Sequence, residues 1–178
     1  MKNTFKNIYM ALLVAIGLVL HIIESYIPVA GSLPGAKLGL ANIASLITVV
    51  IYGPGAALIV SIIRAVLGGL LTGGVSSIPY SLNGAVLSTI IMWLAYRFLT
   101  PKISLIGVSI LGAAAHNIAQ IFTSVIILSN VGLFTYLPVL LVIGTITGYF
   151  IGLVANHTVK TLRINLMKQQ KGGRRIVE

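Results

Sequence analysis

Residues 38–71 read LGLANIASLITVVIYGPGAALIVSIIRAVLGGLL, an apolar stretch in which Arg64 is the only charged side chain. Gly53, Pro54 and Gly55 interrupt the stretch, and these residue types permit the backbone angles of a tight turn. A helix that crosses a bilayer needs about 20 mostly apolar residues, and the runs on the two sides of this turn are only somewhat shorter. We therefore predict two short antiparallel membrane helices, over 38–52 and 55–71.

Similar apolar runs fill most of the remaining chain. The 178 residues are 57% hydrophobic and only 8% charged, which leaves too little polar surface to cover a water-soluble globule. We predict an all-α membrane protein, a six-transmembrane-helix bundle that forms one domain over 1–160. The predicted spans are 8–27, 38–52, 55–71, 82–99, 105–129 and 137–159. A basic cytoplasmic tail over 161–178 follows, and its polar composition predicts fraying from Lys168 onward.

The basic residues predict the orientation in the membrane, because short cytoplasmic loops retain Lys and Arg. Lys2 and Lys6 precede the first span, Arg97 and Lys102 lie between the fourth and fifth, and the tail is rich in both residue types. Lys37, in the first outer loop, is the exception. We expect a multi-pass protein of the cell membrane with both termini in the cytoplasm. The basic residues behind the net charge of +10 would then contact lipid headgroups, and nucleic acid is not an expected partner.

The acidic residues exclude several kinds of chemistry. The chain has no Asp, and Glu24 and Glu178 are its only carboxylate side chains. Magnesium-dependent diphosphate chemistry and paired-carboxylate hydrolysis both require clustered carboxylates. Without Cys, thiolate sites are excluded, and no phosphate-binding G-x-x-x-x-G-K-[ST] loop is present. We expect no enzymatic activity, no cofactor and no metal site, so energy for any transport must come from a partner or an ion gradient.

Two ionisable residues lie inside predicted spans, Glu24 near the outer end of the first and Arg64 in the third. Such groups cost roughly 2.5 to 3.5 kcal/mol on insertion scales unless they are paired or hydrated, so each is a candidate functional residue. Their depths differ by roughly 6 Å, which an Arg side chain can span. The two residues form either a structural ion pair between the first and third spans or part of a ligand site.

The segment PGAKLGLANI, residues 34–43, joins the first two spans. Pro34 and Gly35 indicate a turn, Lys37 offers a cation, and Asn42 follows about one helical turn further in. Such a loop is suited to cover a pocket that opens outward. Alternatively, Lys37 extends to the lipid headgroups.

Further polar residues occur in the fourth and fifth spans. Asn83 lies in SLNGAVLS, residues 81–88, and His116, Asn117 and Gln120 lie in AHNIAQ, residues 115–120. His116 and Gln120 are four residues apart and therefore share a helix face. These side chains either contact a substrate or form hydrogen bonds between helices, each worth only about 0.6 kcal/mol in membranes.

Small residues recur at four-residue spacing on two spans. Gly144, Gly148 and Gly152 do so on the sixth span, and Ala11 and Ala15 on the first. Such spacing lets another helix approach closely. Packing within the bundle explains both sets, and the Ala pair is equally suited to face a partner protein.

PGAKLGLANI, IIRAVLGGLLTGG (residues 62–74), YSLNGAVLS and AHNIAQ together resemble the membrane-protein family labelled heptaprenyl diphosphate synthase component I, also called Gx transporter. The resemblance extends over about residues 8–159. That family is similar in size and six-span layout to the substrate-binding S components of energy-coupling factor (ECF) transporters. The resemblance implies that Ala11 and Ala15 dock on a transmembrane coupling subunit and that the segment from Pro34 to Lys37 gates a substrate pocket. The Asp-rich motifs of prenyl synthases have no counterpart here.

Three functions are compatible with these features. The first is an S component-like subunit that captures a small solute from outside, for import driven by a transmembrane coupling subunit with two ATPase subunits. Its substrate-binding residues would be Glu24, Lys37, Asn42, Arg64, Asn83, His116, Asn117 and Gln120. The second is a non-catalytic accessory subunit in prenyl diphosphate or quinone biosynthesis. The third is a channel or lipid-binding scaffold.

Overall fold

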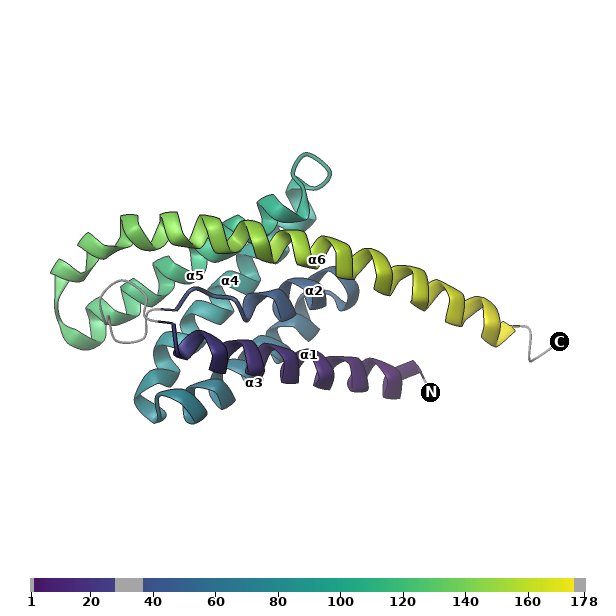
Figure 1. The fold of residues 1–178 in the computed structure, drawn as a ribbon, viewed down its shortest axis with the longest axis horizontal. Coiled ribbons are helices and arrows are strands. Elements are labelled where there is room, and N and C mark those ends of the chain that lie inside the picture. The colour runs from purple at the N-terminus through teal and green to yellow at the C-terminus, as the bar shows by residue number, and fades with distance from the viewer. Residues whose placement is uncertain (1, 28–36, 175–178) are drawn as a thin grey trace.

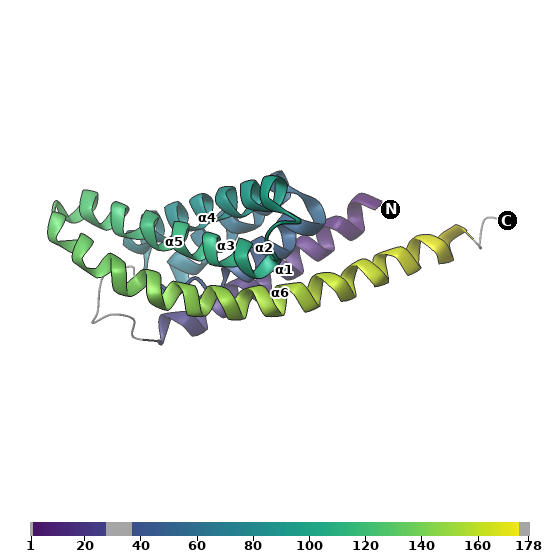
Figure 2. The ribbon, with the colours of Figure 1, turned by 90° about the horizontal axis from the view of Figure 1, so that it is seen from above.

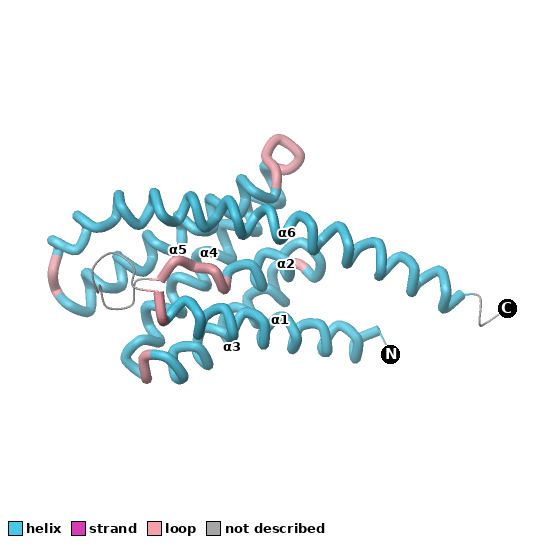
Figure 3. Tube along the Cα trace, in the orientation of Figure 1, coloured by secondary structure: helices cyan, strands magenta, loops and turns pink. Residues whose placement is uncertain are grey.

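The computed structural model describes residues 2–27 and 37–174, and all regular structure in these ranges is helical (Figure 1). The elements in chain order are α1 (Lys2–Ser25), α2 (Asn42–Tyr52), α3 (Pro54–Thr72), the 3₁₀ helix η1 (Val75–Ser77), α4 (Ile78–Leu99), α5 (Leu105–Leu128), the 3₁₀ helix η2 (Val131–Tyr136) and α6 (Leu137–Arg174). Short loops join most of them (Figure 3). Several boundaries follow from local sequence. Pro54 occupies the first turn of α3, where its missing N–H is not needed, and Ser129 ends α5 in the left-handed region at φ 48°.

Five helical stretches among the described residues are long and apolar enough to cross a membrane. They are Thr4–Ser25, Pro54–Thr72, Val75–Leu99, Leu105–Leu128 and Val131–Leu162. Large apolar side chains such as Ile8, Leu71 and Phe122 lie exposed on the outside of the bundle, while polar side chains such as Arg64 and Gln120 are buried within it. This distribution suits a lipid environment, where apolar side chains face outward without cost.

The helix of the predicted second span is shorter than expected. Instead of extending over 38–52, α2 begins at Asn42, and its 11 residues reach only about 16 Å at 1.5 Å per residue. Residues 37–39 have no regular secondary structure, and Gly39 has a φ of +79°, a conformation that favours glycine and is incompatible with a helix. The apolar sequence alone gave no signal for this break.

Helices α1 and α3 run in the same direction and interlock through two glycines. A Cβ atom added to Gly17 of α1 would lie 2.6 Å from Cδ of Arg64, and one added to Gly68 of α3 would lie 2.6 Å from the ring of His21. On each helix a glycine therefore leaves space for a large side chain of the other helix: Arg64 lies against Gly17, and His21 lies against Gly68. The chain termini, at Lys2 and Arg174 within the described ranges, lie at the same end of the bundle (Figures 1 and 2).

The glycine repeat on α6 packs against α5, as one of the two interpretations of the sequence predicts. A Cβ added to Gly148 would lie 2.9 Å from Cα of Ile110, and the corresponding atom on Gly152 would meet the backbone of Ile106. Contact this close between two backbones requires residues without a side chain. Beyond the apolar stretch, α6 continues to Arg174, so the prediction of fraying from Lys168 is wrong over 168–174. Residues 175–178 lie outside the described part.

The backbones of α1 and α6 do not approach closely among the described residues. Figure 1 shows α2 between the two helices, and α2 contacts each of them. The two ends of the chain are therefore held together by a short helix that lies between them.

Candidate functional site

Seven buried polar side chains gather between the middle of the bundle and its distal end, by which we mean the end away from both termini. This polar cluster consists of His21, Glu24, Lys37, Asn42, Arg64, His116 and Gln120. Its members come from α1, α2, α3, α5 and the residues that precede α2. None is more than 9% exposed. Six of the eight substrate-contact candidates named from the sequence belong to it.

The chain just before α2 is inserted into this cluster, and we call residues 37–41 the inserted segment. Its backbone is bonded to three helices. The Lys37 N–H donates to Oε1 of Gln120 at 3.2 Å, and the Gly39 N–H donates to Oε1 of Glu24. The Leu38 carbonyl oxygen lies 3.2 Å from Oγ1 of Thr147 on α6, a hydroxyl that can donate to it or to the Ile143 and Gly144 carbonyls of its own helix at the same distance. The segment therefore fills the centre of the site in this structure.

The Lys37 side chain points inward, so the alternative in which it extends to the headgroups does not hold. Its Nζ contacts Nε2 of His21 and lies 3.4 Å from Oγ1 of Thr72.

Arg64 and Glu24 do not form the ion pair that the sequence allowed. The guanidinium instead donates from Nη2 to Oδ1 of Asn42 at 3.1 Å, while Glu24 accepts from the inserted segment. The side chain of Arg64 is only 2% exposed, so its charge is buried with a neutral amide as its hydrogen-bond partner. A buried charge with so little compensation is expensive, which favours a role beyond stability.

Four side chains of the cluster carry buried nitrogen atoms without a hydrogen-bond partner. These atoms are Nδ2 of Asn42, Nε of Arg64, both ring nitrogens of His116 and Nε2 of Gln120. Leaving each such group unpaired costs about 1–3 kcal/mol. The amide nitrogens and Nε of Arg64 can only donate, and a neutral imidazole donates from one nitrogen and accepts at the other. The cluster therefore holds a surplus of donors, suited to a ligand with several acceptor oxygens.

Asn83 and Asn117 lie outside the cluster and form hydrogen bonds between helices. Nδ2 of Asn83 donates to Oγ1 of Thr123 at 3.0 Å, which joins α4 to α5. Nδ2 of Asn117 donates to the Leu140 carbonyl at 2.7 Å, which joins α5 to α6. For these two residues the interhelical alternative fits the structure better than substrate contact.

His21 was not among the residues selected from the sequence as substrate contacts, although it contacts Lys37. It precedes Glu24 by three residues and therefore shares its helix face, a spacing that would have identified it. Thr147 was also missed, and its hydroxyl gives no sequence signal that separates it from other threonines of α6. Among the described residues, no group of three or more His, Cys, Asp or Glu side chains is placed to hold a metal ion.

Comparison with known protein families agrees with the motifs in the sequence. The model of the family described as heptaprenyl diphosphate synthase component I matches residues 13–158. The chain belongs to the heptaprenyl diphosphate synthase component I family. The match includes the whole polar cluster of this component I protein. Searches of the curated proteins and of the solved structures find no match.

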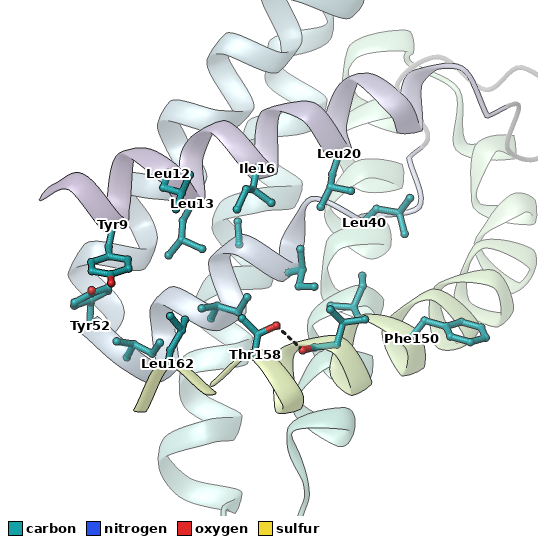
Figure 4. A pocket seen from close by; sticks show the side chains of 16 residues that line it. Tyr9, Leu12, Leu13, Ile16, Leu20, Leu40, Tyr52, Phe150, Thr158 and Leu162 are labelled. Atoms are coloured by element: carbon teal, nitrogen blue, oxygen red, sulfur yellow. Dashed lines mark hydrogen bonds between the residues drawn. The ribbon is translucent and has the colours of Figure 1, made fainter. Parts of the chain in front are cut away.

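The component I protein also has an apolar groove between α1 and α6, with α2 as its floor (Figure 4). Its volume is about 500 Å³. Tyr9 and Tyr52 mark the end near the chain termini, and Leu20 and Leu40 mark the other end. The lining side chains are almost all apolar, so the groove suits a hydrocarbon rather than a polar solute.

Ala11 and Ala15 of this component I protein are exposed on α1. They therefore do not serve packing within the described bundle, unlike the glycines of α6. Their small side chains leave a shallow strip on which another helix can approach.

Proposed function

We propose that this component I protein is a substrate-binding membrane subunit, similar to the S components of ECF transporters, that captures a small solute for import. The observation that carries the proposal is the cluster of buried, unpaired donors inside a bundle with an apolar exterior. A purely structural core does not require a buried guanidinium such as that of Arg64, whose hydrogen-bond partner is the neutral amide of Asn42.

The proposal includes six membrane crossings, with α2 and the inserted segment together as the second. The 11 residues of α2 reach roughly 16 Å, and the inserted segment would supply the remainder of the ~30 Å hydrocarbon thickness. Non-helical backbone at membrane depth must be buried and bonded within the protein. The bonds from Lys37, Leu38 and Gly39 to three helices meet this requirement.

Loading of the site requires the inserted segment to withdraw, because its backbone now lies against the cluster. Withdrawal would release Oε1 of Gln120 and the Glu24 carboxylate and would make room beside His116. The incoming solute would then satisfy the donors of Asn42, Arg64 and Gln120. Pro34 and Gly35, which the sequence places in the same gating loop, lie outside the described residues.

The energy for transport would come from a transmembrane coupling subunit with two ATPase subunits. The exposed Ala11 and Ala15 supply a docking strip for the coupling subunit. We place both termini in the cytoplasm of a cell-membrane protein, since Lys6 and Lys160 are exposed at the terminal end of the bundle. The polar cluster then belongs to the outer half, where an external solute arrives.

The test is mass spectrometry of small molecules retained by the protein after purification in mild detergent. We expect one oxygen-rich compound at near-stoichiometric level, its loss in Arg64→Gln, and its retention in the control Asn83→Ala, which alters a hydrogen bond outside the cluster. A compound retained equally by all three proteins, or none retained by the unaltered protein, would overturn the proposal. Co-purification of a coupling subunit, lost in Ala11→Leu/Ala15→Leu, tests the proposed partner.

The family description favours a second candidate, a non-catalytic membrane subunit in prenyl diphosphate synthesis. That function predicts co-purification of a soluble, Asp-rich synthase and loss of its activity when this chain is deleted. Retention of a solute by the purified chain alone would favour the first candidate.

A further inference from the structure

The apolar groove and the polar cluster share a wall. Leu40 of the inserted segment lines the groove, and the preceding Gly39 contacts Asn42 and His116 of the cluster. Ala44 also lines the groove, and a Cβ added to Gly17 would meet both Ala44 Cβ at 3.1 Å and Arg64 Cδ at 2.6 Å. Gly17 thus lies between Ala44, which lines the groove, and the Arg64 stem, whose guanidinium lies in the cluster. Withdrawal of the inserted segment, which the proposed function requires, would join the two spaces.

The length of the groove suits a single linear chain. Along α1 it extends from Tyr9 to Leu20, 11 residues or about 16 Å. At about 1.2 Å per bond, as in an extended backbone, 16 Å corresponds to roughly 13 bonds of a linear hydrocarbon.

The polar cluster favours a ligand with a negatively charged head. Arg64 brings a buried guanidinium whose hydrogen-bond partner is the neutral amide of Asn42, and the unpaired nitrogens of Asn42 and Gln120 are donors. A carboxylate or phosphate group would accept from several of them together. A cationic or donor-rich group would leave them unpaired and would meet Arg64.

We propose that the substrate is an amphiphile with an oxyanion head, bound in the polar cluster, and one linear apolar tail that lies in the groove between α1 and α6. This inference rests on the proposed function and names the substrate class of the same site. The open side of the groove lets the tail remain in contact with lipid while the head is held by the protein.

The test uses tetradecyl phosphate with a photoreactive diazirine at its last carbon, added to the purified full chain in nanodiscs. The head in the cluster would place the last carbon near Tyr9 and Tyr52, and peptide mapping should find the label there. Excess unlabelled tetradecyl phosphate should remove the label, and tetradecyltrimethylammonium should not. We expect labelling to fall by roughly tenfold in Ile16→Trp, a factor that corresponds to about 1.4 kcal/mol, because Ile16 lines the groove. Val19→Trp should have no effect, since Val19 is exposed on α1 outside the lining.

Butyl phosphate distinguishes the amphiphile inference from the proposed function, because it carries the head without a tail that fills the groove. If it binds in an Arg64-dependent manner while the long probe labels all lipid-facing helices equally, the amphiphile inference fails and the proposed function stands. If neither phosphate binds in an Arg64-dependent manner, the head assignment fails, and a simultaneous lack of any retained solute would remove the proposed function as well. Equal competition by the ammonium compound also overturns the inference.

Discussion

Arg64 and Lys37 show how individual side chains distinguish this bundle from a purely structural one. Both are buried, and neither forms an ion pair with Glu24; Arg64 is bonded to Asn42, and Lys37 contacts His21. Burial without a directly paired carboxylate destabilises the charged forms. In the proposed function, an anionic ligand would supply such a partner for Arg64.

Gly68 is predicted to be essential for the contact between α1 and α3. In Gly68→Ala the new methyl would overlap the His21 ring, with Cβ 2.6 Å from it, and would displace the ring from Lys37. We expect a loss of about 1–3 kcal/mol in the free energy of unfolding. Gly55→Ala is the control, because nothing lies within 4 Å of its Cβ, and alanine is favoured over glycine inside a helix. Thermal unfolding in nanodiscs should show a lower Tm for the first variant only, and equal Tm values would contradict the packing described.

At the scale of elements, α2 and the inserted segment form the least regular part of the bundle. The segment is attached by three backbone hydrogen bonds, each of which contributes about 0.5–1.5 kcal/mol. Its attachment is therefore strong enough to close the site and weak enough to be released by a ligand.

Thr147→Val should loosen this segment, because it removes the hydrogen bond to the Leu38 carbonyl while keeping the shape of the side chain. The loss predicts a roughly 2- to 12-fold larger open population. The natural chain has no Cys, so a single Leu38→Cys reports opening through its rate of reaction with an impermeant maleimide. In Thr145→Val the rate should not change, since Thr145 bonds only to Leu141 of its own helix. Equal rates in both variants would mean that α6 does not hold the segment.

Elements with a simple apolar pattern were predictable from sequence, whereas the inserted segment was not. Five of the predicted spans correspond to helices of sufficient length, and Gly148 packs on α5 as its spacing suggests, because one-dimensional patterns record lipid exposure and close contact. The start of α2 depends instead on Gly39 bonding to Glu24, a contact over 15 residues that no local pattern contains. The sequence also did not predict that Arg64 and Glu24 have separate partners, because the depth of a residue along a helix does not specify which side chains it contacts.

At the scale of the whole molecule, the proposed direction of capture depends on whether the chain crosses the membrane an even or an odd number of times. The model brings Lys2 and Arg174 to one end of the bundle. If α2 and the inserted segment complete a crossing, the turn at Gly53–Gly55 lies on the same side as the N-terminus.

Single cysteines test this topology in intact cells. We expect Tyr26→Cys to react with an impermeant maleimide from outside, since Tyr26 is 82% exposed at the end of α1. Asn7→Cys and Gly55→Cys should react only after the membrane is permeabilised. Reaction of the Gly55 variant from outside would show that α2 does not cross and would remove the six-crossing proposal.

The described parts of α1 and α6 do not approach closely at the backbone, and α2 packs against both, so the groove stays open along this side of the bundle. The proposed amphiphile would reach it sideways from the membrane, without crossing either water-facing end of the protein.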